Sequence, residues 1–154
     1  MIKVLRTDPH DPQATALLKQ SHALMESLFP PEDNFFLDID DLCADHIHFY
    51  TARENGTLLG TGAVALYDDY AEVKSMFTSE AARGKGVAAA LLRQIEDTAR
   101  EHALTALKLE TGDVLHAAHR LYERHGFSFC GPFGGYEDIP ESLFMEKALL
   151  GESP

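Results

Sequence analysis

The order of hydrophobic and polar positions predicts strands that alternate with helices. Apolar residues recur at helical spacing in three stretches, residues 14–29, 87–102 and 114–125, which predicts three amphipathic helices. Shorter apolar runs bounded by turn residues predict strands at residues 2–5, 46–53, 57–66, 71–78, 105–111, 127–130 and 142–147. Strands interleaved with helices indicate a three-layer α/β domain around a mixed sheet.

Turn residues support several of these boundaries. Asp11 followed by Pro12 predicts an N-cap with proline at the first helical position. Asn55 and Gly56 between two apolar runs predict a β-hairpin. Gly126 is placed to end the third helix, because glycine accepts the left-handed conformation that follows a helix.

Length and charge narrow the class of protein. The chain has 154 residues, which predicts one domain over residues 1–150 and a loose tail at residues 151–154. Its net charge of −12 disfavours nucleic acid and anionic membranes as partners. No apolar run approaches the ~20 residues that a membrane span needs. The charge would attract a cationic substrate such as an amine, although a solvated acidic surface is the simpler explanation.

The cysteine and histidine spacing predicts no metal site. Cys43 and Cys130 are far apart in sequence, which matches neither a disulfide framework nor a zinc motif. We expect both thiols to be reduced, which favours a cytoplasmic location. His116 and His119 are three residues apart on a predicted helix and could share a metal, but surface histidines are the favoured interpretation.

The glycine-rich turn at residues 83–88 is the strongest chemical signal. It joins a predicted strand to a predicted helix, so unpaired amides and the positive helix end should together bind a phosphate or pyrophosphate. A nucleotide-binding Walker loop is disfavoured, because Lys85 is followed by Gly86 and not by serine or threonine. The dinucleotide-binding fingerprint needs three glycines, and the third is missing from this turn. The remaining pattern is Arg/Gln-x-x-Gly-x-Gly/Ala, formed by Arg83, Gly86 and Ala88.

In this context the chain resembles the GNAT superfamily of N-acetyltransferases, and in particular its small bacterial members. The resemblance runs from residue 72 to residue 147 and includes the Leu-Tyr-Glu-x-x-Gly-Phe ending at residues 121–127. It implies a three-layer GNAT fold with a central mixed and mostly antiparallel sheet of about seven strands flanked by helices. It also implies acetyl-CoA as the cosubstrate. Leu115 departs from the family pattern, in which an asparagine often contacts the cofactor.

The resemblance assigns cofactor contacts to one strand and to the glycine turn. The strand that contains residues 76–78 would pair through its backbone with the pantetheine arm, and one of its amides would stabilise the oxyanion. This arrangement requires that strand to diverge from the strand at residues 107–110. The turn would wrap the pyrophosphate, unless it is a plain helix start with two solvated basic residues. The residues implied are Met76, Phe77, Thr78, Arg83, Gly84, Lys85, Gly86, Val87, Ala88 and Ala89.

Two catalytic side chains are implied by the same resemblance. Tyr122 would protonate the departing CoA thiolate, unless it is an ordinary core tyrosine. Glu72 would take the proton from an ammonium substrate, directly or through water. A salt bridge with Lys74, or a charge at the rim of the site, explains Glu72 equally well. Glu110 is the reserve candidate for the base.

The function expected from the resemblance is transfer of an acetyl group from acetyl-CoA to a primary amine of a small molecule by direct attack. A non-catalytic acyl-CoA-binding sensor or regulatory module on the same fold is the alternative, because fold does not fix function. We expect the acceptor against the first helix, residues 32–43 and the loop 131–140. Many family members pair as homodimers, and no sequence feature here decides that point.

Overall fold

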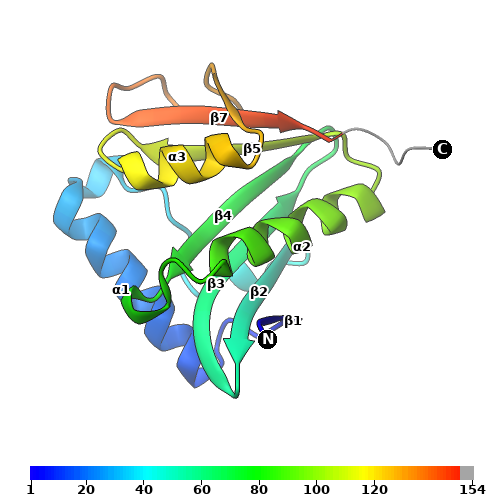
Figure 1. The fold of residues 1–154 in the computed structure, drawn as a ribbon. Helices are drawn as coiled ribbons and strands as arrows, with labels where there is room; N and C mark the ends of the chain where they lie inside the picture. Colours follow the sequence, from blue (N-terminus) through cyan, green and yellow to red (C-terminus); the bar gives the residue numbers. More distant parts are fainter. Residues whose placement is uncertain (150–154) are drawn as a thin grey trace.

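The computed structural model describes residues 1–149, which form a seven-stranded sheet with helices on both faces (Figure 1). The helices are α1 (Pro12–Leu28), α2 (Val87–Glu101) and α3 (His116–Arg124), with 3₁₀ turns η1 (Pro31–Asp33), η2 (Asp41–Cys43) and η3 (Glu80–Ala82). The strands are β1 (Lys3–Arg6), β2 (Ile47–Glu54), β3 (Thr57–Leu66), β4 (Ala71–Thr78), β5 (Ala106–Gly112), β6 (Ser128–Cys130) and β7 (Ser142–Ala148). The expected tail, residues 151–154, lies outside the described residues.

The sheet is mixed and mostly antiparallel, as predicted. The strand order is β1-β2-β3-β4-β5-β7-β6, and within the described residues only β4 and β5 run parallel. These two strands pair only at Ala71 with Leu107 and at Glu72 with Lys108. Beyond that point they diverge, so the sheet opens between them in the direction of the β4 end (Figure 1).

Alternate residues of the central strands supply two separate cores, because successive side chains on a strand point to opposite faces. Phe49 packs in a cluster with Leu18 of α1. The next residue, Tyr50, packs on the other face in a cluster with Leu91 of α2 and Tyr122 of α3. The layers are therefore α1, the sheet, and α2 with α3, which is the predicted three-layer architecture.

A glycine of β3 allows α2 to lie close to the sheet. A Cβ atom added at Gly60 would lie 2.7 Å from Cγ1 of Val87 and 2.8 Å from the carbonyl oxygen of Phe77. Both distances are shorter than non-bonded carbon contacts allow. Gly60 therefore holds the first residue of α2 against the last part of β4, and this contact fixes the position of the glycine turn between them.

Most predicted boundaries agree with the structure to within two residues. The carboxylate of Asp11 accepts a 3.1 Å hydrogen bond from the amide of Ala14, which confirms the predicted N-cap. Helix α3 begins two residues later than predicted, because the amide of Asp113 donates to the carbonyl of Glu141 at 3.0 Å and Leu115 has a non-helical backbone. None of the helices within residues 1–149 has the length and apolarity needed to cross a bilayer.

Candidate active site

A bulge in β4 directs the end of this strand away from its neighbours. The register between β3 and β4 shifts between Thr61 and Ala63, and Ser75 has a φ of 55°. The carbonyl of Ser75 accepts a 2.8 Å hydrogen bond from the hydroxyl of Thr61, which holds the bulge in place. A bulge bends its strand and increases the local twist. The splay from β5 that the sequence argument required is therefore present.

The glycine turn forms an open cradle at the start of α2. Gly84 and Gly86 have φ values of 83° and 82°, and no atom lies within 4 Å of a Cβ added at either. The first backbone hydrogen bond of the helix is donated by the amide of Ala90 to the carbonyl of Gly86 at 3.1 Å. Within residues 1–149 the amides of Val87, Ala88 and Ala89 have no acceptor. These donors, at the positive end of a helix, suit a phosphate group.

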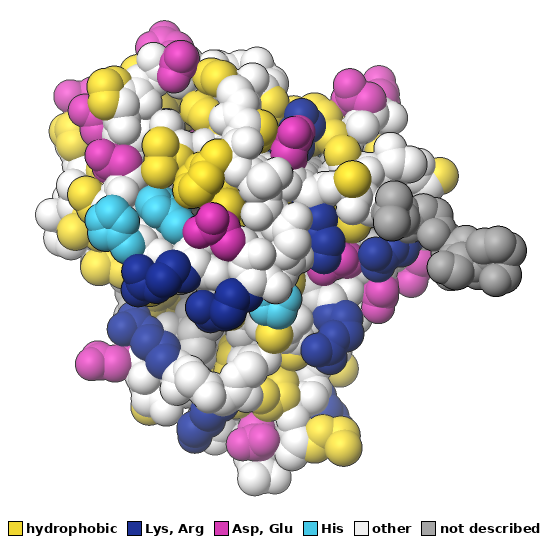
Figure 2. Space-filling model, turned by 45° about the horizontal axis from the view of Figure 1, so that its top comes forward, with side chains coloured by type: hydrophobic (Ala, Val, Ile, Leu, Met, Phe, Trp, Pro, Cys, Tyr) yellow, Lys and Arg dark blue, Asp and Glu magenta, His cyan; other side chains and the backbone are white. Residues whose placement is uncertain are grey.

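A cleft of about 650 Å³ runs from this cradle along the end of β4 to α3. All the predicted cofactor-binding residues line it except Lys85, which is exposed and whose amide donates to the carbonyl of Ala82 at 3.3 Å. The sequence predicted Tyr122 of α3 near the cofactor but not the contributions of Leu24 of α1, Arg124 of α3 and His125, which follows α3. Figure 2 shows Lys and Arg side chains gathered on the face that carries α2 and α3, despite the net charge of −12.

A second, smaller hollow of about 150 Å³ lies on the α1 side of the splay. It is lined by α1, by residues 33–36, and by β4 and β5, and its acidic side chains are Asp33, Glu110 and Glu141. Of the segments predicted near the acceptor, the first helix and residues 33–36 line this hollow, whereas no residue of the loop 131–140 does. The hydroxyl of Ser75 is buried there without a partner in the described chain.

The two hollows meet in the gap between β4 and β5. Five residues line both of them: Met25, Met76, Leu115, Ala118 and Tyr122. Their walls are therefore continuous, and groups bound in the two hollows could meet at this junction. Leu115, which replaces the asparagine common in the resembled family, supplies an apolar side chain to the wall of both hollows.

Tyr122 is both a core residue and a wall of the junction. Its side chain is 7% exposed and packs edge-on against Phe127, with ring centroids 5.6 Å apart. The hydroxyl makes no hydrogen bond with another residue in the range 1–149. Burial raises the pKa of Tyr122 above its ordinary value of 10.0, so the phenol keeps its proton at neutral pH.

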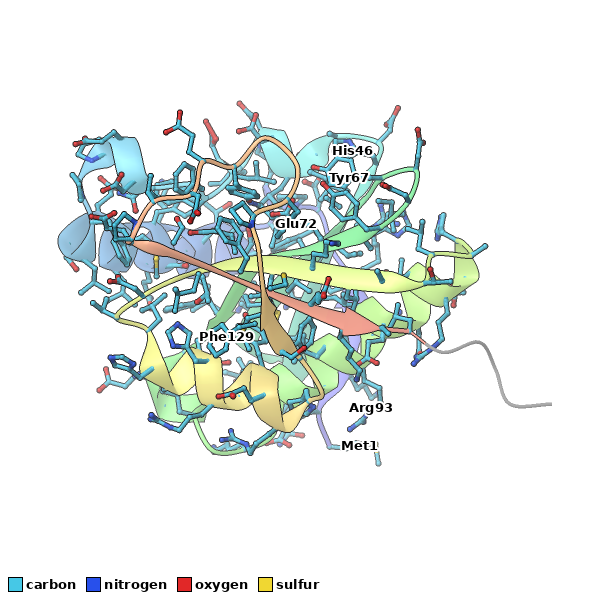
Figure 3. All side chains as sticks on the ribbon, turned by 90° about the horizontal axis from the view of Figure 1, so that it is seen from above. Met1, His46, Tyr67, Glu72, Arg93 and Phe129 are labelled. Carbon is cyan, nitrogen blue, oxygen red and sulfur yellow. The ribbon has the colours of Figure 1, made fainter. Side chains whose placement is uncertain are left out.

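Glu72 is buried in a polar cluster and lines neither hollow. Its Oε2 accepts a 2.5 Å hydrogen bond from the hydroxyl of Tyr136 and lies 3.4 Å from Nζ of Lys74. The Lys74 ammonium also donates to Tyr136 at 2.9 Å and to the carbonyl of Phe35 at 3.2 Å. Glu72 lies near the loop that joins β6 to β7, on the opposite side of the sheet from Phe129 (Figure 3). The rim-charge interpretation is wrong, and the salt bridge with Lys74 is present.

Glu110 lines the small hollow, unlike Glu72. Its Oε2 accepts a 2.8 Å hydrogen bond from the hydroxyl of Ser142. Burial, and to a smaller extent the charge of Glu72, raise the pKa of Glu110, while Ser142 and Lys74 oppose the increase. A carboxylate of raised pKa beside a hollow is a suitable acceptor for a proton from an ammonium group.

One histidine of α3, His119, departs from the surface position expected for it. His119 is buried, and its Nε2 donates a 2.8 Å hydrogen bond to the carbonyl of Gly112, so it ties α3 to the end of β5. His116 is exposed, with its ring centroid 5.6 Å from that of His119. His125 is half-buried and lines the large cleft. Helical periodicity could have assigned His119 to the buried face, because it shares that face with Tyr122.

Comparison with known proteins identifies the family. A sequence profile of the Acetyltransferase (GNAT) family matches residues 12–127. An IAA acetyltransferase of Azospirillum brasilense is 40% identical over 150 residues, which are 96% of this chain and 98% of the relative. A solved structure from Klebsiella pneumoniae, provisionally assigned as an acyl-CoA N-acyltransferase, is 30% identical with a TM-score of 0.85, over 97% of this chain and 99% of that one.

A more distant structure shares the fold. A GNAT family acetyltransferase from Elizabethkingia anophelis, solved with acetyl-CoA bound, is 17% identical with a TM-score of 0.68, over 96% of this chain and 98% of that one. The profile match over most of the chain and the relative of 40% identity establish the resemblance seen in the sequence. This protein belongs to the acetyltransferase (GNAT) family and is an acetyltransferase enzyme.

Proposed function

We propose that this acetyltransferase transfers the acetyl group of acetyl-CoA to a primary amine of a small molecule by direct attack. The observation that carries the proposal is the junction of the two hollows at Tyr122. A thioester in the large cleft and an amine in the small hollow would meet there, with a protonated phenol beside the reacting atoms. Holding two reactants in contact removes much of the entropic barrier of a bimolecular reaction.

The large cleft suits the cofactor. Free amides of Val87, Ala88 and Ala89 would hold the pyrophosphate, with the guanidinium groups of Arg83 and Arg124 nearby. Residues 76–78 lie beyond the point where β4 and β5 diverge, so their backbone is not paired with β5. This free edge would pair with the pantetheine arm. The acetyl-CoA complex of the Elizabethkingia protein supports the same use of this fold.

The small hollow suits a small amine. Its acidic groups, Asp33, Glu110 and Glu141, would attract an ammonium ion, and the net charge of −12 adds in the same direction. A volume of about 150 Å³ excludes a macromolecule from the hollow itself.

Two reduced cysteines fit a reducing compartment, so we retain the cytoplasm as the proposed location.

In the proposed reaction the amine nitrogen forms a bond to the thioester carbonyl carbon, and the carbon–sulfur bond then breaks. The Tyr122 hydroxyl gives its proton to the departing thiolate. A carboxylate takes one proton from the ammonium substrate, which leaves the neutral amine that attacks. The second proton that the nitrogen loses as the amide forms restores the Tyr122 hydroxyl, directly or through water. The sequence predicts Glu72 as the carboxylate base, with Glu110 as the reserve. Glu110 now has the better position, because it lines the hollow while Oε2 of Glu72 already accepts two hydrogen bonds.

The decisive experiment is an assay of CoA release with matched amines. Purified protein would be incubated with acetyl-CoA and with cationic, neutral and anionic primary amines of similar size. We expect free CoA and the N-acetylated amine in equal amounts, with cationic or neutral amines preferred. Binding of acetyl-CoA without turnover of any amine would contradict the proposal and favour the non-catalytic sensor module.

A further inference from the structure

A cluster of potential metal ligands lies outside both hollows, where the turn before α1 meets η2. Asp8 and His10 belong to the turn, and Cys43 ends η2. One ligand atom from each side chain lies within 4.8 Å of the other two. None of the three residues lines the cofactor cleft or the acceptor hollow, so the cluster has no part in the proposed acetyl transfer.

We propose that Asp8, His10 and Cys43 form a binding site for a zinc ion, with His10 as the central ligand through Nδ1. The Nδ1 atom lies 3.6 Å from Sγ of Cys43 and 3.3 Å from Oδ1 of Asp8. Tetrahedral zinc with ordinary bond lengths separates its sulfur, nitrogen and oxygen ligands by roughly 3.3–3.6 Å. The two separations that involve His10 therefore already match those of a shared zinc ion, and the Cys43 and Asp8 ligand atoms lie within 4.8 Å of each other.

A fourth side chain orients the central ligand. The other ring nitrogen of His10, Nε2, is hydrogen-bonded to Oδ1 of Asp40 at 2.8 Å. Histidines that bind a metal through one ring nitrogen commonly donate the other N–H to a carboxylate, which fixes the tautomer and makes the ligand more basic. With Asp40 on Nε2, the lone pair of Nδ1 points toward the cluster. Asp40 is thus a positioning residue and not a ligand.

The ligand set favours zinc over calcium or magnesium. A thiolate, an imidazole and a carboxylate are the usual donors for zinc, whereas calcium and magnesium prefer oxygen alone. An open groove of about 440 Å³ borders Asp8 and Cys43, which gives an entry path and room for a water molecule as fourth ligand. Oδ1 of Asp8 also accepts a 2.9 Å hydrogen bond from the His10 amide, which holds this oxygen in place.

The proposed consequence is structural. A metal at this point would join the turn before α1 to the segment before β2, which are separated by about thirty residues of sequence. Cross-linking two distant segments stabilises the folded state, because metal that binds only the native protein shifts the folding equilibrium. We therefore expect Zn²⁺ to raise the melting temperature of the full chain.

The test is calorimetric titration of Zn²⁺ alone into the chelator-treated, dialysed full chain. We expect one equivalent to bind to the wild type and to Cys130→Ser, which removes the other cysteine. Cys43→Ser and His10→Gln should abolish this equivalent. Asp40→Asn changes no ligand and should weaken the affinity by about 10–100-fold. Acetyl-CoA affinity and circular dichroism would show that each variant is folded.

Cobalt supplies an independent readout of the cysteine ligand. Co²⁺ should give a thiolate charge-transfer absorption band that Cys130→Ser retains and Cys43→Ser loses. The proposal is overturned if no stoichiometric Zn²⁺ binds, or if an equivalent survives Cys43→Ser and disappears in His116→Gln. If a ligand variant does not fold, unchanged Zn²⁺ affinity in Asp40→Asn would still contradict the geometry proposed for His10.

Discussion

The hydroxyl of Tyr136 donates a 2.5 Å hydrogen bond to Oε2 of Glu72. This contact joins the loop between β6 and β7 to the start of the splay in the sheet. Burial, followed by the charge of Glu72, raises the pKa of Tyr136, so this phenol stays protonated and remains a donor. With the ammonium of Lys74, Tyr136 compensates a carboxylate that is only 4% exposed.

Removing Lys74 should therefore destabilise the fold. Lys74→Met leaves the buried Glu72 charge without its cation, and breaking a buried ion pair costs about 3–5 kcal/mol. The free energy of unfolding, measured by urea denaturation at neutral pH, should fall by about that amount. Adding Glu72→Gln to Lys74→Met should restore most of the loss, because the buried charge of Glu72 is then removed together with its cation.

An ion pair of the same length but greater exposure provides the control. Arg100 lies 3.4 Å from Glu96, and the Arg100 side chain is 36% exposed. Lys147 also contacts Glu96 at 3.0 Å, so the carboxylate keeps a cation when Arg100 is removed. Arg100→Met should cost at most about 1 kcal/mol. Equal losses in Lys74→Met and Arg100→Met would show that burial of the Glu72 cluster has no energetic consequence.

Glu110→Gln should separate the two candidate bases by its effect on activity. If Glu110 accepts the proton, wild-type turnover rises with pH through the raised pKa of this carboxyl group, and the variant loses that rise. Activity should recover at a pH above the pKa of the amine, where solvent supplies neutral amine. Glu72→Gln is the matched variant, and a pH-dependent loss confined to Glu72→Gln would assign the base to Glu72.

Glu110→Gln should also change stability, with a sign set by the direction of the pKa shift. The pKa of Glu110 in the folded state is raised above its ordinary value of 4.5, chiefly by burial. The folded protein then binds this proton more tightly than the unfolded chain, so stability falls as pH rises from about 4.5 through the folded pKa. The variant should gain stability relative to wild type over that range, as measured by denaturation at several pH values. A constant difference across the range would contradict the assignment.

The sheet and the cradle could be predicted from the sequence because their signals are local. The hairpin at Asn55 and the cap at Asp11 are specified by adjacent residues, and the glycine turn is a short motif. The hydrogen bond of Tyr136 to Glu72 could not be predicted, because the two residues are 64 positions apart. The cluster of His10 and Cys43 could not be predicted for the same reason, because these two residues lie 33 positions apart and match no zinc spacing.

The acceptor side was the least predictable part for a related reason. The hollow is built from α1, residues 33–36 and the splayed strands, and its shape depends on how these elements pack. The sequence predicted the first helix, residues 32–43 and the loop 131–140 near the acceptor, but it did not indicate that this loop contributes no residue to the hollow or which side chains line it. Glu110 and Glu72 both fit the role of base by position on their strands, and only the three-dimensional arrangement placed Glu110 in the hollow.

Gly86→Asp should weaken acetyl-CoA binding strongly. The substitution adds a side chain and a negative charge where the unpaired amides would hold pyrophosphate. Gly56→Asp is the control, because Gly56 has a φ of 79°, an equally open surrounding and a position in the distant hairpin. Both variants place aspartate in the left-handed region and bear a similar backbone strain. Calorimetry should show a loss of acetyl-CoA affinity in Gly86→Asp alone. Equal acetyl-CoA affinities in the two variants would contradict the binding of pyrophosphate in the cradle.

Tyr122→Phe should lower the turnover number while leaving acetyl-CoA affinity nearly unchanged. The substitution removes only a hydroxyl that makes no hydrogen bond within residues 1–149, so packing against Phe127 and the fold should persist. Loss of a general acid typically lowers the rate by about 10²–10⁴-fold. Tyr67→Phe is the matched control, since Tyr67 is 41% exposed and lines neither hollow. Near-full turnover by Tyr122→Phe with the accepted amine would mean that the thiolate takes its proton from another donor.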